Sequence, residues 1–411
     1  MQISKPFVSF GVETECLKSP RKRSNLILQT PVTREEDAIP SVSLVDMFLK
    51  ARELERKGLD VIHFDAGEPD FDPPEEVVEA TVRALRGGKA RYTESAGIPD
   101  AKKAIAEHLN QKYHVAVTPD QVLVTAGGRL ALYYSFLSLP KTAKVGLISP
   151  DWPAYRDISK FLSLPIQFFG STLENNWDVD LEEIQKSNCN VLVLNYPSNP
   201  TGKILDLDTY EKLVRIANEK QMTIISDEVY SDYVFTPEKH YKSILEMEGT
   251  KSLLVTSLSK SYAMTGFRAA YIVSDAKTIS YLTKFNSMII TSMPEFVQYA
   301  LIAALGCHEY VREKASMIKR RRDVAARALK KYLGAEFYLS DGSMYMFPRL
   351  HARHGTFNSE KFAVELLNKE YVSVTPGTSF GSRFLDHIRI TLLQPEARIE
   401  EGIERMAKVL D

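Results

Sequence analysis

Two apolar runs of this sequence, at residues 223–227 and 253–257, end in side chains that could do chemistry. The polar residues at and after their ends are Asp227, Tyr230, Ser257, Ser259, Lys260 and Arg268. A lysine can form a Schiff base, and a buried carboxylate can stabilise a cationic ring nitrogen. Hydroxyl and guanidinium groups can bind a phosphate. Any one of these residues alone is more often a surface group or a helix cap, but together they are the groups that pyridoxal phosphate requires.

These runs belong to a longer series of strand-like segments that must position the polar residues. Between about residues 101 and 304, apolar runs of about five residues alternate with stretches that fit amphipathic helices. The runs are VLVTA (122–126), VGLISP (145–150), PIQFFG (165–170), VLVLNYP (191–197), TIISDE (223–228) and LLVTSLS (253–259). They predict an α/β fold with a mostly parallel central sheet and helices on both faces. Ligands of such sheets bind beyond the carboxyl ends of the strands, so the residues after each run are the candidates for chemistry.

The sequence on either side of this region has a different character. Apolar residues at helical spacing predict a helix from Val42 to Lys57, and the first forty residues, which mix prolines with charges, predict an extended arm. A long charged helix is expected from Glu309 to Leu333, with its basic cluster KRRR (319–322) on a solvated face. Strand-like pieces follow at MYMFPRL (344–350), VSVTP (372–376) and IRITL (388–392). This C-terminal part is expected to form a smaller α+β unit.

Composition excludes several classes of protein. The 411 residues carry 52 Lys and Arg against 53 Asp and Glu, so the net charge of −1 gives no basic excess for a polyanionic partner. The three cysteines lie more than a hundred residues apart and form neither a zinc spacing nor a small disulfide framework. No apolar stretch reaches the roughly 18 residues of a membrane span, and no secretory signal is visible. We expect a soluble, cytoplasmic protein.

Motifs along the chain carry a resemblance to a known family. They are GEPDF (67–71), ARYTESAGIPDAKKAIAEHL (90–109), TAGGR (125–129), SPDWPAY (149–155), NYPSNPTG (195–202), SDEVY (226–230), SLSKSYAMTGFR (257–268) and IRITL (388–392). In this order and at these separations they are highly specific. From about residue 40 to its C-terminus, the chain resembles a class I pyridoxal-phosphate aminotransferase of fold type I, closest to the subgroup Ib aspartate aminotransferases.

The resemblance implies a cofactor, pyridoxal 5′-phosphate, and a role for each predicted residue. Lys260 would form a Schiff base with the cofactor and later move a proton between the substrate α-carbon and the cofactor. Asp227 would keep the ring nitrogen protonated, and Asn199 and Tyr230 would bind the phenolic oxygen. Trp152 would stack on the ring. The phosphate would be held by Gly127, Gly128, Arg129, Ser257, Ser259 and Arg268, where free N–H groups at a helix start also favour an anion.

The substrate is implied by two arginines. Arg389 matches the family's two-donor fork for the α-carboxylate, with the N–H of Gly67 as a second contact and with Trp152 and Asn199 beside it. Without the resemblance, Arg389 would be interpreted as a surface charge on an edge strand. Subgroup Ib aspartate aminotransferases place a lysine at the position of Arg129, where it meets the distal carboxylate. Arginine is a departure that can do the same, which implies L-aspartate and 2-oxoglutarate as substrates and oxaloacetate and L-glutamate as products.

The resemblance also implies an assembly and a domain plan. Tyr92 matches a tyrosine that reaches the cofactor phosphate of the neighbouring subunit, so a homodimer with shared active sites is expected. The domain plan is an arm at 1–40, a large cofactor-binding domain at 66–304, and a small domain assembled from 41–65 and 305–411.

The sequence is also compatible with other functions. Tyr155 and Phe267 follow site motifs and could line an apolar pocket, as in an aromatic or broad-specificity aminotransferase. A carbon–sulfur lyase could use the same scaffold. A cofactor-binding regulator is disfavoured because the chain offers no basic DNA-binding module, and a dinucleotide enzyme because no G-x-G-x-x-G follows the first strand.

Overall fold

A computed structural model describes residues 44–352 and 354–410, so the predicted arm at 1–40 lies outside the described residues. Seven strands form one sheet in the order β2-β8-β7-β6-β5-β3-β4. Their bounds are β2 Val122–Ala126, β3 Val145–Ser149, β4 Ile166–Gly170, β5 Val191–Asn195, β6 Thr223–Asp227, β7 Ser252–Ser257 and β8 Ala269–Val273. Six of these strands coincide with the predicted apolar runs, and β8 is an addition.

The direction of the strands brings the predicted residues to one edge. The pairs β4–β3, β3–β5, β5–β6 and β6–β7 are parallel, whereas β8 runs antiparallel to both β7 and β2. In the register, Asn195 lies opposite Asp227. Because β8 starts at the edge where its neighbours end, Arg268, directly before β8, joins the residues that follow the parallel strands. The prediction of an α/β fold with a mostly parallel sheet is confirmed.

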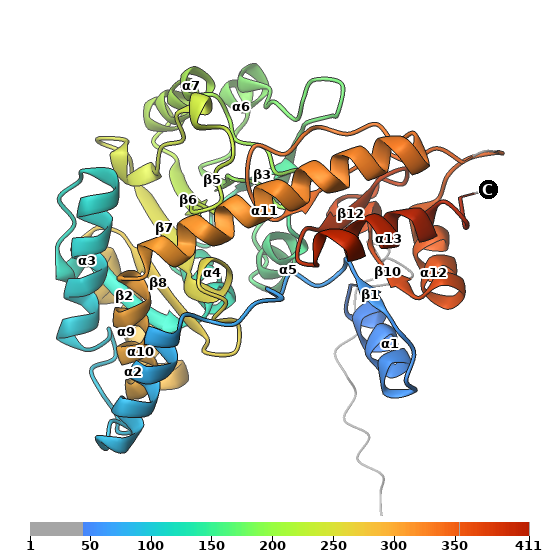
Figure 1. Cartoon of the computed structure of the whole chain (residues 1–411). Coiled ribbons are helices and arrows are strands. Elements are labelled where there is room, and N and C mark those ends of the chain that lie inside the picture. The colour runs from blue at the N-terminus through green and yellow to red at the C-terminus, as the bar shows by residue number, and fades with distance from the viewer. Residues whose placement is uncertain (1–43, 353, 411) are drawn as a thin grey trace, which may run out of the picture. The chain divides into compact units, whose positions relative to one another are not determined.

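Helices cover both faces of the sheet (Figure 1). One face packs against α2 (Glu75–Arg86), α3 (Pro99–Tyr113), α7 (Leu207–Glu219) and α10 (Glu295–Leu305), and α6 (Leu181–Lys186) lies beside α7. The other face packs against α4 (Gly128–Leu137), α5 (Pro153–Phe161) and α9 (Ala276–Ile290). Side chains of a strand alternate between the faces, so Val122 and Val124 enter one core and Leu123 the other. This two-sided burial explains why the runs are continuously apolar.

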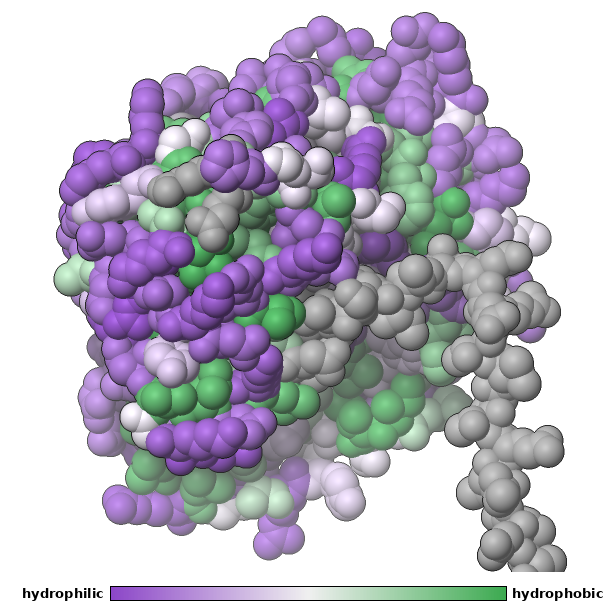
Figure 2. Space-filling model, turned by 90° about the vertical axis from the view of Figure 1, so that its right-hand side faces the viewer, coloured by the Kyte–Doolittle hydropathy of each residue, from purple (hydrophilic) through white to green (hydrophobic). Residues whose placement is uncertain are grey.

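A further hydrophobic core joins segments from both ends of the described chain (Figure 1). Its helices are α1 (Leu44–Arg56), α11 (His308–Ala328), α12 (Ser359–Glu370) and α13 (Glu396–Met406). Its strands are β1 (Ile62–His63), which pairs with β10 (Val372–Ser373), and the set β11 (Thr375–Pro376), β12 (Ile388–Thr391) and β9 (Tyr345–Met346). The outward residues of α13 are largely charged. Figure 2 views the molecule from the right-hand side of Figure 1, and this face is mostly hydrophilic.

The basic cluster of α11 corrects a prediction. Lys319 and Arg320 are exposed as expected, but Arg321 and Arg322 are buried, so the expectation of a solvated cluster is wrong for them. They belong to an inward stripe at i, i+3, i+4 and i+7 that begins at Ile318. Arg321 forms two hydrogen bonds to Asp70, of 2.7 and 2.8 Å, and Arg322 pairs with Asp323 over 2.7 Å and donates to a backbone carbonyl. Paired in this way, both guanidinium groups can be buried.

Two predicted absences concern the described residues. No helix between residues 44 and 410 that the structure describes is long and apolar enough to cross a membrane. In the same part of the chain, no group of three or more His, Cys, Asp or Glu side chains is arranged to hold a metal ion. Cys189 and Cys307 are free thiols.

Candidate active site

A cavity of about 330 Å³ opens at the carboxyl edge of the parallel strands. All predicted site residues line it except Gly127 and Tyr92. The lining residues are Gly67, Gly128, Arg129, Leu132, Trp152, Tyr155, Asn195, Asn199, Asp227, Val229, Tyr230, Ser257, Ser259, Lys260, Thr265, Arg268, Tyr345 and Arg389. Gly127 adjoins the cavity through its neighbour Gly128, whereas Tyr92 is 86% exposed and lies outside it. Segments from both ends of the described chain therefore meet at one site.

Lys260 reaches the cavity from α8 (Leu258–Ser261), the short helix directly after β7. Its Nζ donates a hydrogen bond of 2.5 Å to the carbonyl oxygen of Gly67. Burial lowers the pKa of the Lys260 ammonium, and the cations Arg389 and Arg268 lower it further. A lowered pKa increases the share of neutral amine at neutral pH, and the neutral amine is the form that attacks a carbonyl carbon.

Asp227 lies at the end of β6 and is only 4% exposed. Burial raises the pKa of its carboxyl to about 6, while the hydrogen bond from Tyr155 lowers it. That bond joins the Tyr155 hydroxyl to Oδ2 over 2.6 Å, and the N–H of Val229 donates to Oδ1 over 3.3 Å. The carboxylate can thus be ionised near neutral pH, above all beside a cationic ligand.

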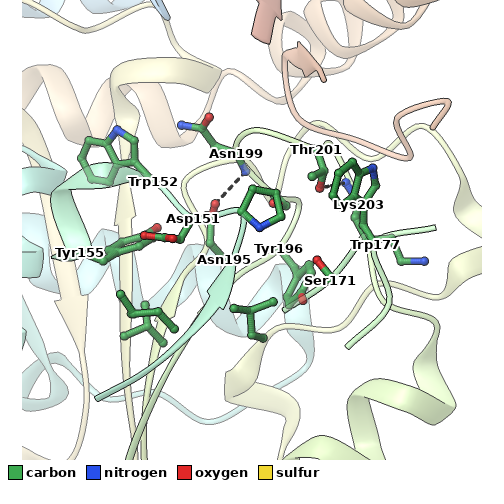
Figure 3. Close-up of a pocket in the computed structure, with 15 residues that line it drawn as sticks. Asp151, Trp152, Tyr155, Ser171, Trp177, Asn195, Tyr196, Asn199, Thr201 and Lys203 are labelled. Carbon is green, nitrogen blue, oxygen red and sulfur yellow. Dashed lines mark hydrogen bonds between the residues drawn. The ribbon is translucent and has the colours of Figure 1, made fainter. Parts of the chain in front are cut away.

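Asn195, at the end of β5, is hydrogen-bonded both to β6, the strand that carries Asp227, and to the loop that follows β5. Its side-chain amide donates to the backbone oxygen of Asp227 over 2.9 Å, and its oxygen accepts the N–H of Asn199 over 2.8 Å. Figure 3 shows this second bond near the centre of the view, with Trp152 and Tyr155 to its left. A smaller cavity of about 20 Å³ lies among these residues and shares them with the larger one. Asn195 therefore holds two walls of the site in register.

The start of α4 forms a corner that suits an anion. Gly127 has φ +91°, which favours glycine, and a Cβ there would lie 2.2 Å from Nη2 of Arg268 and would displace that guanidinium. Opposite the glycines, the hydroxyls of Ser257 and Ser259 are 2.8 Å apart, and the N–H of Ser259 donates to Ser257 Oγ. The N–H groups of a helix start, two hydroxyls and a guanidinium are the donors that a phosphate monoester needs.

Arg389 is buried in β12, the central strand of its small sheet, with 4% of its surface exposed. It is therefore not a surface charge. Its Nη1 donates to Asn199 Oδ1 over 3.3 Å, and its Nη2 donates to Thr375 Oγ1 over 3.2 Å and to a backbone carbonyl. These partners are neutral, and its buried Nε has none among the described residues. A buried guanidinium with neutral partners can take a carboxylate into the cavity.

Arg129 differs from Arg389 in its exposure. It follows the two glycines at the start of α4, and its side chain extends over the ring of Trp152, with Cζ 5.1 Å from the ring centroid. The Trp152 ring in turn meets Tyr155 edge to face, with centroids 5.5 Å apart. The cation is therefore held at the mouth of the cavity by a cation–π contact and remains accessible to a second anionic group.

The loop of the GEPDF motif (67–71) contributes Gly67 to the wall of the cavity. Besides accepting the bond from Lys260, it is attached at two points to distant elements. The hydroxyl of Thr265 donates to Glu68 over 2.8 Å, and Asp70 forms the paired contact with Arg321 in α11. Thr265 also accepts a bond from Arg268 through its carbonyl. The loop is thereby linked to the anion corner and to α11.

The sequence was compared with models of known protein families. The family model described as "Aminotransferase class I and II" matches residues 59–406. The chain belongs to the class I and II aminotransferases. This confirms the family resemblance drawn from the motifs.

Individual relatives cover nearly the whole aminotransferase. A probable aspartate/prephenate aminotransferase of Aquifex aeolicus is 34% identical over 379 residues, which are 88% of this chain and 94% of that protein. The (5-formylfuran-3-yl)methyl phosphate transaminase of Methanocaldococcus jannaschii is 33% identical over 375 residues, with coverage of 90% and 97%. A structure of the Thermus thermophilus aspartate aminotransferase with maleate has a TM-score of 0.82 at 30% identity, covering 93% of this chain and 100% of that one.

The residues of this aminotransferase suit pyridoxal phosphate, the cofactor of the family. A carboxylate buried at the cavity floor would suit the ring nitrogen, and the corner at Gly127 leaves room only for backbone beside Arg268. The sequence interpretation missed Asn195, Thr265 and Tyr345, and it considered Tyr155 only as an apolar wall. Asn195 ends a predicted run, so its place at a strand end was a usable signal, whereas Tyr345 had none.

Proposed function

We propose that this aminotransferase uses pyridoxal phosphate and transfers the amino group of L-aspartate to 2-oxoglutarate, giving oxaloacetate and L-glutamate. One observation carries the proposal: two guanidinium groups, Arg389 and Arg129, line the cavity that holds Lys260. Arg389 is buried among neutral partners and Arg129 is accessible at the mouth. Two cations so placed suit a substrate with two carboxylates.

The bound cofactor would supply an electron sink for the substrate α-carbon. Asp227 would pair with the ring nitrogen, and Tyr155 would hold that carboxylate in place through its 2.6 Å bond. Trp152 would cover the ring, while Asn199 and Tyr230 would bind its phenolic oxygen. The phosphate would occupy the corner formed by Gly127, Gly128, the backbone N–H of Arg129, Ser257, Ser259 and Arg268.

Lys260 would bind the cofactor covalently and then act as the base of the reaction. Its lowered pKa favours the neutral amine, which can take a proton from the α-carbon and return it to the cofactor. Release from the cofactor would leave Nζ within the same cavity, near Gly67. The lysine would therefore stay beside the atoms between which the proton moves.

The substrate would lie between the two arginines. Arg389 and the N–H of Gly67 would bind the α-carboxylate, which every amino acid has, so they would fix its orientation rather than select it. Arg129 would bind the distal carboxylate and thereby favour aspartate over apolar amino acids. The relative from Thermus thermophilus, solved with the dicarboxylate maleate, supports this assignment. Phe267, the proposed wall of an apolar pocket, instead packs against the hydrophobic core on one face of the large sheet and does not line the cavity.

Assembly and domain division are part of the same proposal. Tyr92, which is 86% exposed, would be covered by a second copy of the chain, in whose active site it would contact the phosphate. Within one chain, residues 66–304 would form the large domain, and 41–65 with 305–411 the small one. Sedimentation of the wild type and Tyr92→Ala would test the dimer.

The test of specificity is a panel of amino donors with 2-oxoglutarate, measured on the wild type and Arg129→Leu. Loss of one charge-assisted contact is expected to lower kcat/KM for aspartate roughly 10- to 100-fold while activity on apolar donors changes little. Arg83→Leu, at a position 69% exposed on α2, is the matched control. Equal losses for all donors in Arg129→Leu would mean that Arg129 serves only the phosphate.

One relative favours a second candidate function, with a phosphate-bearing substrate. The enzyme from Methanocaldococcus jannaschii is named for a phosphate-bearing substrate, and a guanidinium binds phosphate as well as carboxylate. Activity on phosphorylated aldehydes that exceeds activity with aspartate, and that is lost in Arg129→Leu, would favour this function.

A further inference from the structure

Tyr345 contacts two of the residues around which the active site is built, Arg389 and Tyr230. It is 2% exposed and lies in β9. Its ring lies under Arg389, with the guanidinium Cζ 4.4 Å from the ring centroid. Its hydroxyl is 3.2 Å from the hydroxyl of Tyr230, and the two rings meet edge to face at 5.6 Å. No family motif in the sequence pointed to this residue.

The backbone fixes this tyrosine firmly. In the register of β9 with β12, Tyr345 lies opposite Thr391, which places its ring beside the strand that carries Arg389. The carbonyl of Tyr345 accepts a hydrogen bond of 2.7 Å from Ser340. On the other side, a Cβ at Gly67 would lie 2.2 Å from the Tyr345 hydroxyl. The loop that carries Gly67 can therefore approach only because this residue has no side chain.

The ring fixes the plane of the Arg389 guanidinium. Arg389 has neutral hydrogen-bond partners, and its Nε has none in the described part of the chain. Hydrogen bonds therefore define its position incompletely. An aromatic face attracts the cation and leaves the edges of the guanidinium open to a ligand. A second ring, Phe380, lies 5.2 Å from Cζ and completes the enclosure.

The hydroxyl has a separate effect, on Tyr230. Each of the two tyrosines has one proton to donate, and a bond between them uses one proton. If Tyr345 donates to Tyr230, the hydroxyl proton of Tyr230 is free for another acceptor. Because both side chains line the cavity, that acceptor can be a ligand in the cavity. Burial, and next to it the proximity of Tyr345, raise the pKa of Tyr230, so that it remains a protonated donor.

We propose that Tyr345 is a positioning residue of this aminotransferase, whose ring holds Arg389 ready for the substrate α-carboxylate and whose hydroxyl directs Tyr230 into the cavity. The inference rests on the proposed function only through the roles of Arg389 and Tyr230. It assigns two separable tasks to one side chain, and two substitutions separate them. Tyr345→Phe removes the hydroxyl and keeps the ring, whereas Tyr345→Leu removes both.

The ring is tested by binding of maleate, an unreactive dicarboxylate, to the holoenzyme by calorimetry. Tyr345→Leu is expected to raise the Kd of maleate and the KM of the amino donor about tenfold, and Tyr345→Phe to leave both within about twofold. Tyr332→Phe, in a tyrosine that contacts Glu400 outside the cavity, is the matched control. Unchanged maleate binding in a folded Tyr345→Leu protein would overturn the role of the ring, and thermal unfolding of each variant establishes folding.

The hydroxyl is tested by the near-visible absorption of the holoenzyme as a function of pH. Tyr345→Phe is expected to move the titration of this band to higher pH and to lower kcat more than it raises KM. Identical titration curves in Tyr345→Phe and wild type would overturn the role of the hydroxyl.

If aspartate is not the substrate, these experiments give a result that differs from failure of the inference about Tyr345. Wild-type protein would then fail to bind maleate and would prefer another donor. The KM ratio of Tyr345→Leu to Tyr345→Phe for that donor would still be about ten, since Arg389 meets the carboxylate that all donors share. A ratio near one would refute the inference whatever the donor.

Discussion

The hydroxyl of Tyr155 donates a 2.6 Å hydrogen bond to Oδ2 of the buried Asp227. The bond lowers the pKa of a carboxyl that burial raises to about 6. It joins the start of α5, directly after Trp152, to the end of β6. The strength of the proposed contact between Asp227 and the ring nitrogen therefore depends on Tyr155, which would not itself touch the ring nitrogen.

Tyr155→Phe is expected to raise the pKa of Asp227 further. Protonated Asp227 cannot pair with a cationic ring, so cofactor binding to the apoenzyme should weaken as the pH falls through about 6 in the wild type, and at higher pH in the variant. Fluorescence titration with pyridoxal phosphate from pH 5 to 8 measures this, and kcat should fall roughly tenfold at pH 7. Superimposable pH curves would show that the bond does not tune Asp227.

Gly127→Ala and Gly58→Ala form a matched pair of backbone substitutions. Both glycines have positive φ, +91° and +83°, so both variants should lose about 1–3 kcal/mol of stability from strain. Only at residue 127 would the new Cβ collide with Arg268, since nothing lies within 4 Å of the one at residue 58. Affinity for pyridoxal phosphate should fall at least about tenfold in Gly127→Ala alone. A similar affinity in the two variants would contradict the anion corner.

Asp70→Ala should destabilise the protein by about 2–3 kcal/mol, because it leaves the guanidinium of Arg321, with 8% of its side chain exposed, without its carboxylate. The loop of Gly67 should also loosen, raising KM for the amino donor. The double variant Asp70→Ala, Arg321→Leu should regain part of the stability, since it removes the unpaired buried charge. Thermal unfolding of Asp70→Ala, Arg321→Leu and the double variant gives the coupling, and purely additive losses would mean that the pair contributes nothing.

Asp151 gives a prediction about pH and stability. It is 4% exposed beside Arg156, and burial raises the pKa of its carboxyl to about 7. The folded state thus binds a proton more tightly than the unfolded state, whose carboxyl pKa is about 4. Its contribution to stability is therefore full below about pH 4 and is lost as pH rises to about 7, by at most about 1.4 kcal/mol per pH unit.

Asp151→Asn removes this titration. The unfolding temperature of the variant relative to wild type should therefore rise between pH 5 and pH 8. Asp208→Asn, 73% exposed on α7, is the control in which this difference should stay constant. A difference that does not change with pH in Asp151→Asn would refute the raised pKa.

The convergence of Lys260 and Asp227 could be predicted from sequence because it follows from strand direction. Residues at the carboxyl ends of parallel strands meet at one edge whatever the lengths of the connections. Arg268 joined them for a reason that the sequence does not display, since β8 is antiparallel and begins at that edge. Here the family motif predicted the residue, and the topology supplies the physical cause.

Other features depend on contacts that no local pattern encodes. Tyr345 lies in a strand of two residues, too short for any periodicity, and its place under Arg389 depends on the register of β9 with β12. The burial of Arg321 was predictable in principle, because the apolar Ile318 lies three residues before it on the same helix face. Its partner Asp70 lies 251 residues away in sequence and could not be inferred.

The most direct test of the account is the ratio of kcat/KM for L-aspartate to that for L-phenylalanine, with 2-oxoglutarate as acceptor, in the wild-type holoenzyme. Two arginines in one cavity predict that aspartate is preferred by roughly 100-fold or more, as expected when a charged contact is present for one substrate and absent for the other. A kcat/KM for phenylalanine equal to or above that for aspartate would contradict the dicarboxylate assignment.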